Sequence, residues 1–493
     1  MPTFLSVNNL ADLTGTSIAT AQRWGECGVF PYHKNEKGKK GFYMEELSNV
    51  EPVRMMLNTN WEEEFHAAPL RDYTSVELFA GAGGLALGMH LAGFRHVLLN
   101  EMDSMACQTL RKNHPEWNVL EGDIHQVDFT PLRDKVDFIS GGFPCQAFSY
   151  AGKKGGLNDT RGTLFFEVER ILKDKKPFGF ILENVEGLAT HDKEQAKDKI
   201  GRTLKTILNK LEMIGYKTNW KILNSNQFGI PQDRKRIYIV GTLKTIPNLD
   251  NFQEIKSVLK NILEKNLPTS NSEFVKLILS HYSVSELSGK SIKDKRGGKD
   301  NIHSWDIEYK GKISNTEKQL LNLLLKERRK KKWAEEYGID WMDGMPLTKE
   351  QIKTFFNVSN LEEILENLTN KKYLKKEHPK RKIGNKRVPD ETLPLGYNIV
   401  AGKMSYEVGK ILDENSISPT LTAMDMQHLF VIDGNGIRQL SLREGLRLFG
   451  YPDNFKFNID KKLGYDLLGN TVAVPVISAV SKRVLSIWQG ERP

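Results

Sequence analysis

The sequence predicts an α/β fold built on a mostly parallel sheet, with a small helical unit in front of it. From Thr74 onward, apolar runs of strand length alternate with helical patterns, an order typical of parallel strands joined by crossover helices. Residues 5–24 instead show two short amphipathic helices separated by Gly15. A chain of 493 residues, 39% of them hydrophobic, is long enough for about two to four domains with their own cores.

Composition excludes several classes of protein. No apolar run is long enough to span a bilayer, and residues 1–20 lack a basic start followed by an apolar block, so we expect a cytoplasmic protein without membrane contact. Cys27, Cys107 and Cys145 lie far apart, and the histidines show no ligand spacing, which argues against disulfides and a metal site. The net charge of +9 and the basic block at residues 371–387 fit a nucleic-acid partner, although such a block can also be a solvated surface.

The N-terminal residues predict a helix-turn-helix unit over residues 1–65. Its second helix is expected to begin with Thr16 or Ser17 as the N-cap, and the turn before it contains glycine. The unit resembles the MerR-like group of DNA-binding domains, with Arg23 near the end of the recognition helix. In such a domain the wing would be formed by residues 28–31 and 41–43. The alternative is an appendage that only packs, and residues 51–72 read as a linker.

The strands that follow end in residues with chemical potential. Because the carboxyl ends of parallel strands meet at one edge of a sheet, these residues are expected to line a common cleft. The apolar run 74–79 leads into residues 80–84, and the run 97–99 leads into Asn100 and Glu101. The run 136–139 leads into residues 141–145, and the run 178–182 leads into Glu183 and Asn184.

The glycine-rich turn after the first strand predicts a cofactor site. Gly81, Gly83 and Gly84 allow the backbone to turn tightly and to approach a ligand. Glu101 stands 18 residues after Gly83, where a carboxylate can accept hydrogen bonds from both ribose hydroxyls. Asp123 could accept from an adenine amino group, with Ile124 packing on the ring. This pattern indicates a nucleoside cofactor, and at this point a nicotinamide dinucleotide fits as well.

Cys145, Glu183 and a pair of arginines indicate the chemistry. Cys145 follows a strand, two glycines and Pro144, a placement that suits a nucleophile better than a buried core residue. A thiolate that adds to carbon 6 of cytosine makes carbon 5 nucleophilic enough to take a methyl group. The addition requires protonation of the ring nitrogen, which a glutamic acid such as Glu183 can supply if burial raises its pKa. An arginine at the ring carbonyl, from Arg234 or Arg236, stabilises the developing negative charge.

At this point the chain resembles the DNA (cytosine-5)-methyltransferases of bacterial restriction–modification systems. The resemblance covers residues 74–242 and about 416–490, and its eight motifs occur in the order of the family. The motifs lie at residues 75–84, 100–103, 122–124, 141–149, 183–185, 227–237, 440–452 and 465–472. The resemblance implies a Rossmann-like S-adenosylmethionine-dependent methyltransferase domain, a smaller target-recognition domain and no metal.

The family's site residues carry over onto this sequence. Cys145 would be the nucleophile, Glu183 the proton donor and Arg236 the contact to the base carbonyl. The catalytic group would be completed by Arg234, Gln232 and Asn184. The cofactor site would comprise Phe79, Gly81, Gly83, Gly84, Glu101, Met102, Asp123, Ile124, Asn470 and Val472. Contacts with DNA would involve Gln146, Ser149, Thr420 and Arg23, and base-reading candidates lie at 296–301, 303–305 and 418–422.

The resemblance also implies a domain order and a function. The expected parts are the helix-turn-helix unit 1–65, the catalytic domain 72–245, the target-recognition domain 246–460 and a C-terminal segment 461–493 that returns to the catalytic domain. Helical patterns at 313–334 and 349–368 would form the scaffold of the target-recognition domain. The enzyme is expected to act as a monomer, flipping a cytosine out of a short double-stranded DNA site. It would protect host DNA from a cognate restriction endonuclease and repress its own promoter through the N-terminal unit.

Two other functions remain open from the sequence. A relative that methylates transfer RNA would share these motifs, but it would have a short recognition region and no helix-turn-helix. A DNA-binding regulator with vestigial catalysis would not need Cys145, Glu183 and Arg236 intact. Nothing in the sequence positions a hydride acceptor, which argues against a dehydrogenase.

Overall fold

The computed structural model divides the chain into two compact units, which we describe separately. Unit 1 consists of Met1–Pro268, Glu414–Gln427 and Leu440–Pro493, and unit 2 consists of Thr269–Asp413 and His428–Gln439. Unit 2 is therefore smaller than the expected target-recognition domain 246–460. The structure describes residues 4–14, 17–35, 37–47, 73–130, 132, 136–143, 164–193, 195, 197–295, 297–384, 386–401, 406–422, 424–456 and 461–488.

Unit 1 contains a seven-stranded sheet with the order β6-β5-β4-β7-β8-β10-β9. The first five strands of this order run parallel, and β10 is antiparallel to both β8 and β9. The strands are β4 Tyr73–Leu78, β5 Phe94–Glu101, β6 Val119–Glu121, β7 Phe138–Gly141, β8 Gly179–Val185, β9 Lys217–Asn224 and β10 Lys235–Thr242. The chain order turns back between β4 and β7, which creates the crevice where ligands bind in open α/β sheets.

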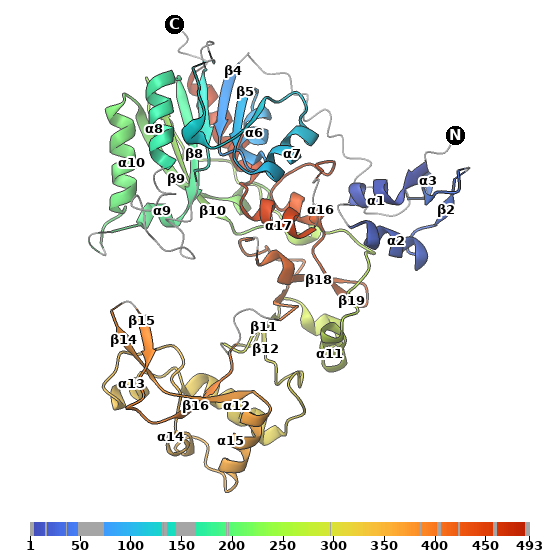
Figure 1. Ribbon diagram of the computed structural model, residues 1–493, viewed down its shortest axis with the longest axis vertical. Helices are drawn as coiled ribbons and strands as arrows, with labels where there is room; N and C mark the ends of the chain where they lie inside the picture. The colour runs from blue at the N-terminus through green and yellow to red at the C-terminus, as the bar shows by residue number, and fades with distance from the viewer. Residues whose placement is uncertain are drawn as a thin grey trace. The chain divides into compact units, whose positions relative to one another are not determined.

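Helices cover both faces of this sheet (Figure 1). The covering helices are α6 Gly84–His90, α7 Ser104–Asn113, α8 Leu164–Lys175, α10 Arg202–Met213 and α18 Val474–Trp488. Unit 1 also contains α9 Gly187–Thr190, α16 Leu442–Arg447 and α17 Lys461–Gly469. Short 3-10 turns lie at η1 Ile124–Gln126, η3 Ser225–Gln227, η4 Leu259–Asn261 and η6 Met426–His428.

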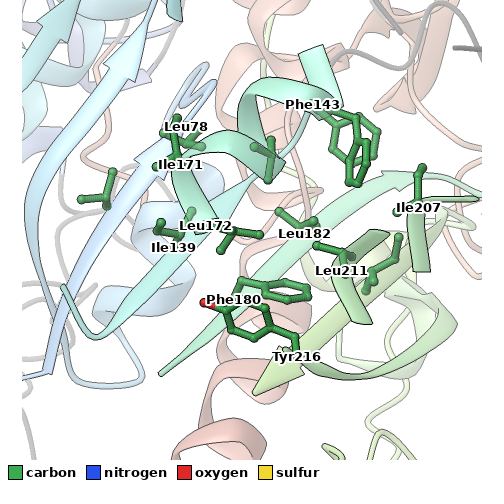
Figure 2. Packing of buried hydrophobic residues seen from close by; sticks show 14 of the residues in the cluster. Leu78, Ile139, Phe143, Ile171, Leu172, Phe180, Leu182, Ile207, Leu211 and Tyr216 are labelled. Carbon is green, nitrogen blue, oxygen red and sulfur yellow. The ribbon is translucent and has the colours of Figure 1, made fainter. Parts of the chain in front are cut away.

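The alternation of side chains along β8 explains the two cores of the sheet. Phe180 and Leu182 belong to the core under α8 and α10, whereas Ile181 belongs to the core under α6 and α18. Figure 2 shows the first core, where side chains of α8 and α10 meet those of β8 and Tyr216. The rings of Phe180 and Tyr216 pack edge to face with centroids 5.1 Å apart. The predicted α/β class is thus confirmed.

The N-terminal residues form a small cluster of elements whose core also includes Leu267. They are β1 Phe4–Ser6, α1 Val7–Thr14, α2 Ile18–Glu26, β2 His33–Lys34, β3 Lys40–Tyr43 and α3 Met44–Leu47. Ser17 is the N-cap of α2, and its hydroxyl accepts a hydrogen bond from the backbone N–H of Thr20 at 3.1 Å. Trp24 and Phe30 pack edge to face in the core of the cluster, while Arg23 is exposed on α2. The expected linker 51–72 lies outside the described residues.

Unit 2 combines a five-stranded sheet of order β12-β11-β17-β18-β19 with a group of helices. Its strands are β11 Ser291–Ile292, β12 Asn301–Ile302, β13 Leu374–Glu377, β14 Lys380–Ile383, β15 Lys386–Pro389, β16 Gly396–Ile399, β17 Lys410–Ile411, β18 Leu429–Asp433 and β19 Gly436–Gln439. Its helices are α11 Glu273–His281, η5 Val284–Leu287, α12 Asn315–Glu327, α13 Lys332–Glu336, α14 Lys349–Lys353 and α15 Leu361–Asn370.

Both long helical patterns expected in unit 2 are interrupted. The pattern 313–334 divides into α12 and α13, and Trp333 stabilises the break by donating its indole N–H to the carbonyl of Glu327 at 2.8 Å. The pattern 349–368 divides into α14 and α15 around 354–360, a stretch that contains Asn357, Ser359 and Asn360, residue types of low helix propensity.

One set of expected base-reading residues lies in the interior of unit 2. His303, Ser304 and Trp305 are all buried. The Ser304 hydroxyl donates to Asp294 at 2.7 Å, and the Trp305 indole N–H donates to Asn322 at 3.1 Å. The prediction that these three residues contact DNA bases is therefore wrong, because they are buried and their polar atoms form hydrogen bonds within unit 2.

Candidate functional site

A cavity of about 530 Å³ opens at the carboxyl-end edge of the sheet in unit 1. Residues that directly follow or end β4, β5, β6, β7 and β8 line it, which confirms the predicted common cleft. Its described lining comprises Phe79, Gly81, Asn100, Glu101, Met102, Asp103, Met105, Ala106, Gly122, Asp123, Ile124, Gly142, Phe143, Leu164, Glu183, Val185, Arg234, Arg236, Asp466, Leu467, Gly469 and Asn470. Its size suits a ligand of nucleoside dimensions.

The glycine-rich turn at one side of the cavity is held by a carboxylate. Phe79 and Gly81 both have left-handed backbone, with φ of 59° and 54°. One oxygen of Glu101 accepts from the N–H of Gly81 at 2.7 Å, and the other accepts from the N–H groups of Met102 and Asp103, each at 2.8 Å. Glu101 thus both orders the turn and presents negative charge to the cavity.

The next strand end adds a second carboxylate and an apolar surface. Asp123 accepts from the backbone N–H of His125 at 3.0 Å, and this bond, with the His125 side chain, lowers the pKa of Asp123. Ile124 is buried beside it, whereas Met102 is 70% exposed at the cavity. Two carboxylates with the apolar side chains of Phe79 and Ile124 fit a ligand that carries hydroxyls, an aromatic ring and positive charge.

Glu183 and Arg236 form the reactive part of the lining. They come from the neighbouring antiparallel strands β8 and β10, and Nε of Arg236 lies 3.2 Å from Oε1 of Glu183. Burial raises the pKa of Glu183, and the positive charges of Arg236 and Arg234 only partly oppose this. The carboxyl group therefore keeps its proton to a higher pH than an exposed glutamic acid would, as the proton-donor prediction requires.

Asn184 points to the other side of β8 and holds the chain that leads to Cys145. Its side-chain N–H donates to the carbonyl of Phe143 at 3.0 Å, and its oxygen accepts from the N–H of Val185 at 2.9 Å. Phe143 stands two residues before Cys145. Cys145, Gln146 and Ser149 themselves lie outside the described residues.

Gln232 and Arg234 are engaged by backbone carbonyls and amides from distant segments. The Gln232 amide donates to the carbonyl of Leu448 at 2.7 Å and accepts from the N–H of Leu421 at 3.0 Å. The Arg234 guanidinium donates to the carbonyls of Leu421, Gly469 and Thr471, at 3.0, 3.2 and 2.5 Å.

These bonds bring the C-terminal motif to the cavity. Asn470 lines the cavity as expected, together with Asp466, Leu467 and Gly469, which the sequence analysis did not single out. The signal for them was present, because they stand in the motif 465–472 beside Asn470. Thr420 hydrogen-bonds through its hydroxyl to the carbonyl of Asp233, so it contacts the loop that carries Arg234.

Three expected cofactor residues serve packing behind the cavity. A Cβ on Gly84 would lie 2.5 Å from Oγ1 of Thr471 and 3.0 Å from Cγ2 of Val472. A Cβ on Gly83 would lie 2.6 Å from the Leu110 side chain. Gly83 and Gly84 are thus small so that α6 can approach its neighbours, and Val472 belongs to the core beneath that helix.

The described residues contain no cluster of three or more His, Cys, Asp or Glu side chains able to hold a metal ion. They also contain no helix with both the length and the apolar character needed to cross a membrane.

Comparisons with known proteins place these motifs in one family. A family model described as C-5 cytosine-specific DNA methylase matches residues 73–486. The Type II methyltransferase M.NlaIV of Neisseria lactamica is 58% identical over 416 residues, which are 83% of this chain and 98% of the relative. M.NgoBV of Neisseria gonorrhoeae is 57% identical over the same shares of the two chains. M.BanI of Aneurinibacillus aneurinilyticus is 41% identical over 82% of this chain and 94% of its own.

The packing role of Gly84 predicts a loss of stability on substitution. Gly84→Ala should lower the melting temperature, because its methyl group overpacks Thr471 and Val472, an effect of about 1–3 kcal/mol. Gly122→Ala is the matched control, since Gly122 also lines the cavity but a Cβ there meets nothing within 4 Å. Thermal unfolding of both variants provides the measurement. Equal melting temperatures would show that α6 does not need the small residue.

Proposed function

Because the chain belongs to the C-5 cytosine-specific DNA methylases, we propose that it methylates one cytosine in a short double-stranded sequence through a covalent Cys145 adduct. It is a DNA (cytosine-5)-methyltransferase of the type II restriction–modification class, and its substrate is DNA. The observation that carries the proposal is the Glu183–Arg236 pair in the cavity, next to Asn184, which holds the chain leading to Cys145.

The family implies S-adenosylmethionine as the methyl donor, and the cavity fits it. When bound, the donor supplies an electrophilic methyl group on a positively charged sulfur. Phe79 and Ile124 would hold the adenine ring, and Glu101 would accept from the ribose hydroxyls with the lone pairs that the turn leaves open. Asp123 would accept from the adenine amino group, and Asn470 and Met102 would bound the cavity at its edges.

The target cytosine would reach this site by flipping out of the duplex. A base inside the DNA stack cannot be approached by a thiolate from above its ring, so the nucleotide must leave the stack. Arg236 then donates to the carbonyl oxygen of the base, and Glu183 faces the ring nitrogen. Arg234 supports both residues indirectly, because it keeps the backbone of the C-terminal segments against the cavity.

The covalent step balances with the groups that the chain provides. The Cys145 thiolate forms a bond to carbon 6, and the electron pair of the 5,6 double bond becomes available at carbon 5 while Glu183 gives its proton to the ring nitrogen. Carbon 5 takes the methyl group as the bond between that group and the donor sulfur breaks, and the electron pair of that bond stays on the sulfur. Carbon 5 then loses its own proton to a water molecule, the 5,6 double bond re-forms, and the bond from the Cys145 sulfur to carbon 6 breaks, which regenerates the thiolate. The ring nitrogen returns its proton to Glu183.

We assign the choice of DNA sequence to unit 2. It is a separate compact unit of residues 269–413 and 428–439, and its charge is concentrated in the basic block 371–387. Methylation of that sequence would protect host DNA from a cognate restriction endonuclease. A monomer suffices for this reaction, because one chain contributes every residue that the mechanism uses.

A second role concerns the N-terminal unit. The family match begins at residue 73, so this unit adds a function that the methyltransferase fold does not need. Helices α1 and α2 with the β2–β3 hairpin have the order of a winged helix-turn-helix, and Arg23 is exposed on α2. We propose that it binds the promoter of the enzyme's own gene and represses it.

Replacement of Cys145 tests the covalent route. Bisulfite sequencing of plasmid DNA from cells that express the enzyme should show protected cytosines in one short sequence context. Cys145→Ala should abolish protection while retaining specific DNA binding, because only the nucleophile is lost. Cys27→Ala is the control, since Cys27 stands outside the methylase match, and it should leave protection unchanged. Residual methylation by Cys145→Ala would exclude the adduct.

The raised pKa of Glu183 predicts a descending limb in the pH profile. The protonated carboxyl is the active form, so kcat should fall as the pH rises through the pKa of Glu183 in the folded enzyme. Glu183→Gln should lower kcat by about 10²- to 10⁴-fold and remove this limb, because an amide cannot transfer a proton. Glu186→Gln, an exposed neighbour, is the control. A variant that keeps both the rate and the limb would contradict the assignment.

Removal of residues 1–65 tests the repressor role. The shortened enzyme should lose binding to its promoter fragment and keep methylation of plasmid DNA within about twofold, since its catalytic residues lie in the methylase match. Arg23→Ala in the full chain should weaken promoter binding alone, with Lys217→Ala on β9 as the control. Loss of methylation on deletion would assign the unit to substrate binding.

A further inference from the structure

Unit 2 carries an isolated two-stranded ribbon, formed by β14 and β15 and called here the basic ribbon (residues 380–389). The strands are antiparallel and pair Lys380 with Pro389, Arg381 with Val388, Lys382 with Arg387 and Ile383 with Lys386. The two strands form a sheet of their own, and nearly every residue in them is exposed. Figure 1 labels both strands within unit 2. An exposed two-stranded ribbon gains little stability by itself, which points to a functional reason for it.

The pairing divides the ribbon into two faces. Side chains of paired residues share a face, so Lys382 and Arg387 lie on one face, and Arg381, Ile383, Lys386 and Val388 lie on the other. Arg387 donates to the backbone carbonyl of Trp341 at 2.7 Å, so the first face is partly used within unit 2. The second face is open to solvent, with Ile383 64% exposed and Val388 42% exposed.

The charge around this open face favours a polyanion. Residues 371–387 hold nine Lys or Arg and one acid. Arg381 is paired with Asp390 at 2.7 Å, but among the described side chains no carboxylate forms an ion pair with Lys382 or Lys386. Lys386 shares the open face with two exposed apolar side chains, and Lys382 adds a second cation without an ion partner on the opposite face, which is an unusual surface for a protein in water.

The shape and chemistry of the ribbon match the major groove of DNA. That groove admits a two-stranded β-ribbon, its edges carry phosphates, and thymine presents a methyl group that apolar side chains contact. We propose that the basic ribbon enters the major groove of the substrate duplex, with Ile383 and Val388 of the open face against base edges. Lys386 on the same face and Lys382 on the opposite face would both reach phosphates at the edges of the groove. This proposal rests on the proposed function, because it names the surface by which that enzyme reads its site.

The two kinds of side chain should contribute differently. Contacts of lysine with phosphate raise affinity for any duplex and make it depend on salt, because binding releases condensed counterions. Contacts of Ile383 and Val388 with base edges should affect mainly the discrimination between sequences. Two exposed apolar side chains are too small a surface for binding in a lipid bilayer, where a wide apolar face is needed.

The phosphate contacts are tested with a double variant of the full-length enzyme. Lys382→Ala with Lys386→Ala should raise KM for DNA about tenfold and reduce the slope of log K against log salt by about 2, while kcat at saturating DNA stays within about twofold. Lys205→Ala with Lys217→Ala, two exposed lysines on α10 and β9 of unit 1, is the matched control. Unchanged KM and slope in the ribbon variant would overturn the proposal.

The base contacts are tested with Ile383→Ser. Discrimination between the methylated sequence and a duplex with one changed base pair should fall about tenfold, with nearly unchanged salt dependence. If Ile383→Ser still discriminates between the two duplexes as the wild type does, the ribbon does not read the base sequence. Cofactor affinity and melting temperature of each variant establish that it is folded. If the wild type methylates no DNA, the proposed function fails, whereas methylation by the wild type with no effect of the ribbon variants rejects only this inference.

Discussion

The buried guanidinium of Arg234 is the interaction on which the catalytic edge of unit 1 depends. It donates to three backbone carbonyls from segments 187, 235 and 237 residues further along the chain, and it lies over the ring of Phe449. A buried cation is stable only when its donors are satisfied, so these segments must return to the sheet for Arg234 to be accommodated. The Gln232 amide adds two bonds of the same kind. The C-terminal part of the cavity is thereby assembled.

The strand that follows Arg234 brings the Glu183–Arg236 pair together. Two residues after Arg234, on β10, Arg236 meets Glu183 of the neighbouring strand β8. Burial raises the pKa of Glu183, while the two arginines limit the rise. On the other face of β8, Asn184 fixes Phe143 and so the approach of the chain to Cys145. Alternation along β8 therefore places the Glu183–Arg236 pair on one face of the strand and the bond from Asn184 to Phe143 on the other.

Sequence reasoning was accurate where the signal is local. Strand-length runs followed by glycine or carboxylate residues placed Phe79, Glu101, Asp123 and Glu183 at one edge of the sheet, and the cavity lining agrees. Sequence reasoning was less accurate where ligand binding and core packing both favour the same residue type. Gly84 can be small either for a ligand or for packing, and only its distance to Thr471 distinguishes the two.

By itself, the sequence determined the α/β class, the alternation of strands and helices along the chain and the set of reactive residue types, because each follows from local periodicity and short motifs. The tertiary structure decided which of those residues face the cavity and which hold it together. Arg234 and Gln232 carry structural bonds to distant carbonyls, and His303, Ser304 and Trp305 are buried. Such outcomes depend on contacts between residues far apart in the chain, and no local pattern records which side chain will meet which backbone group.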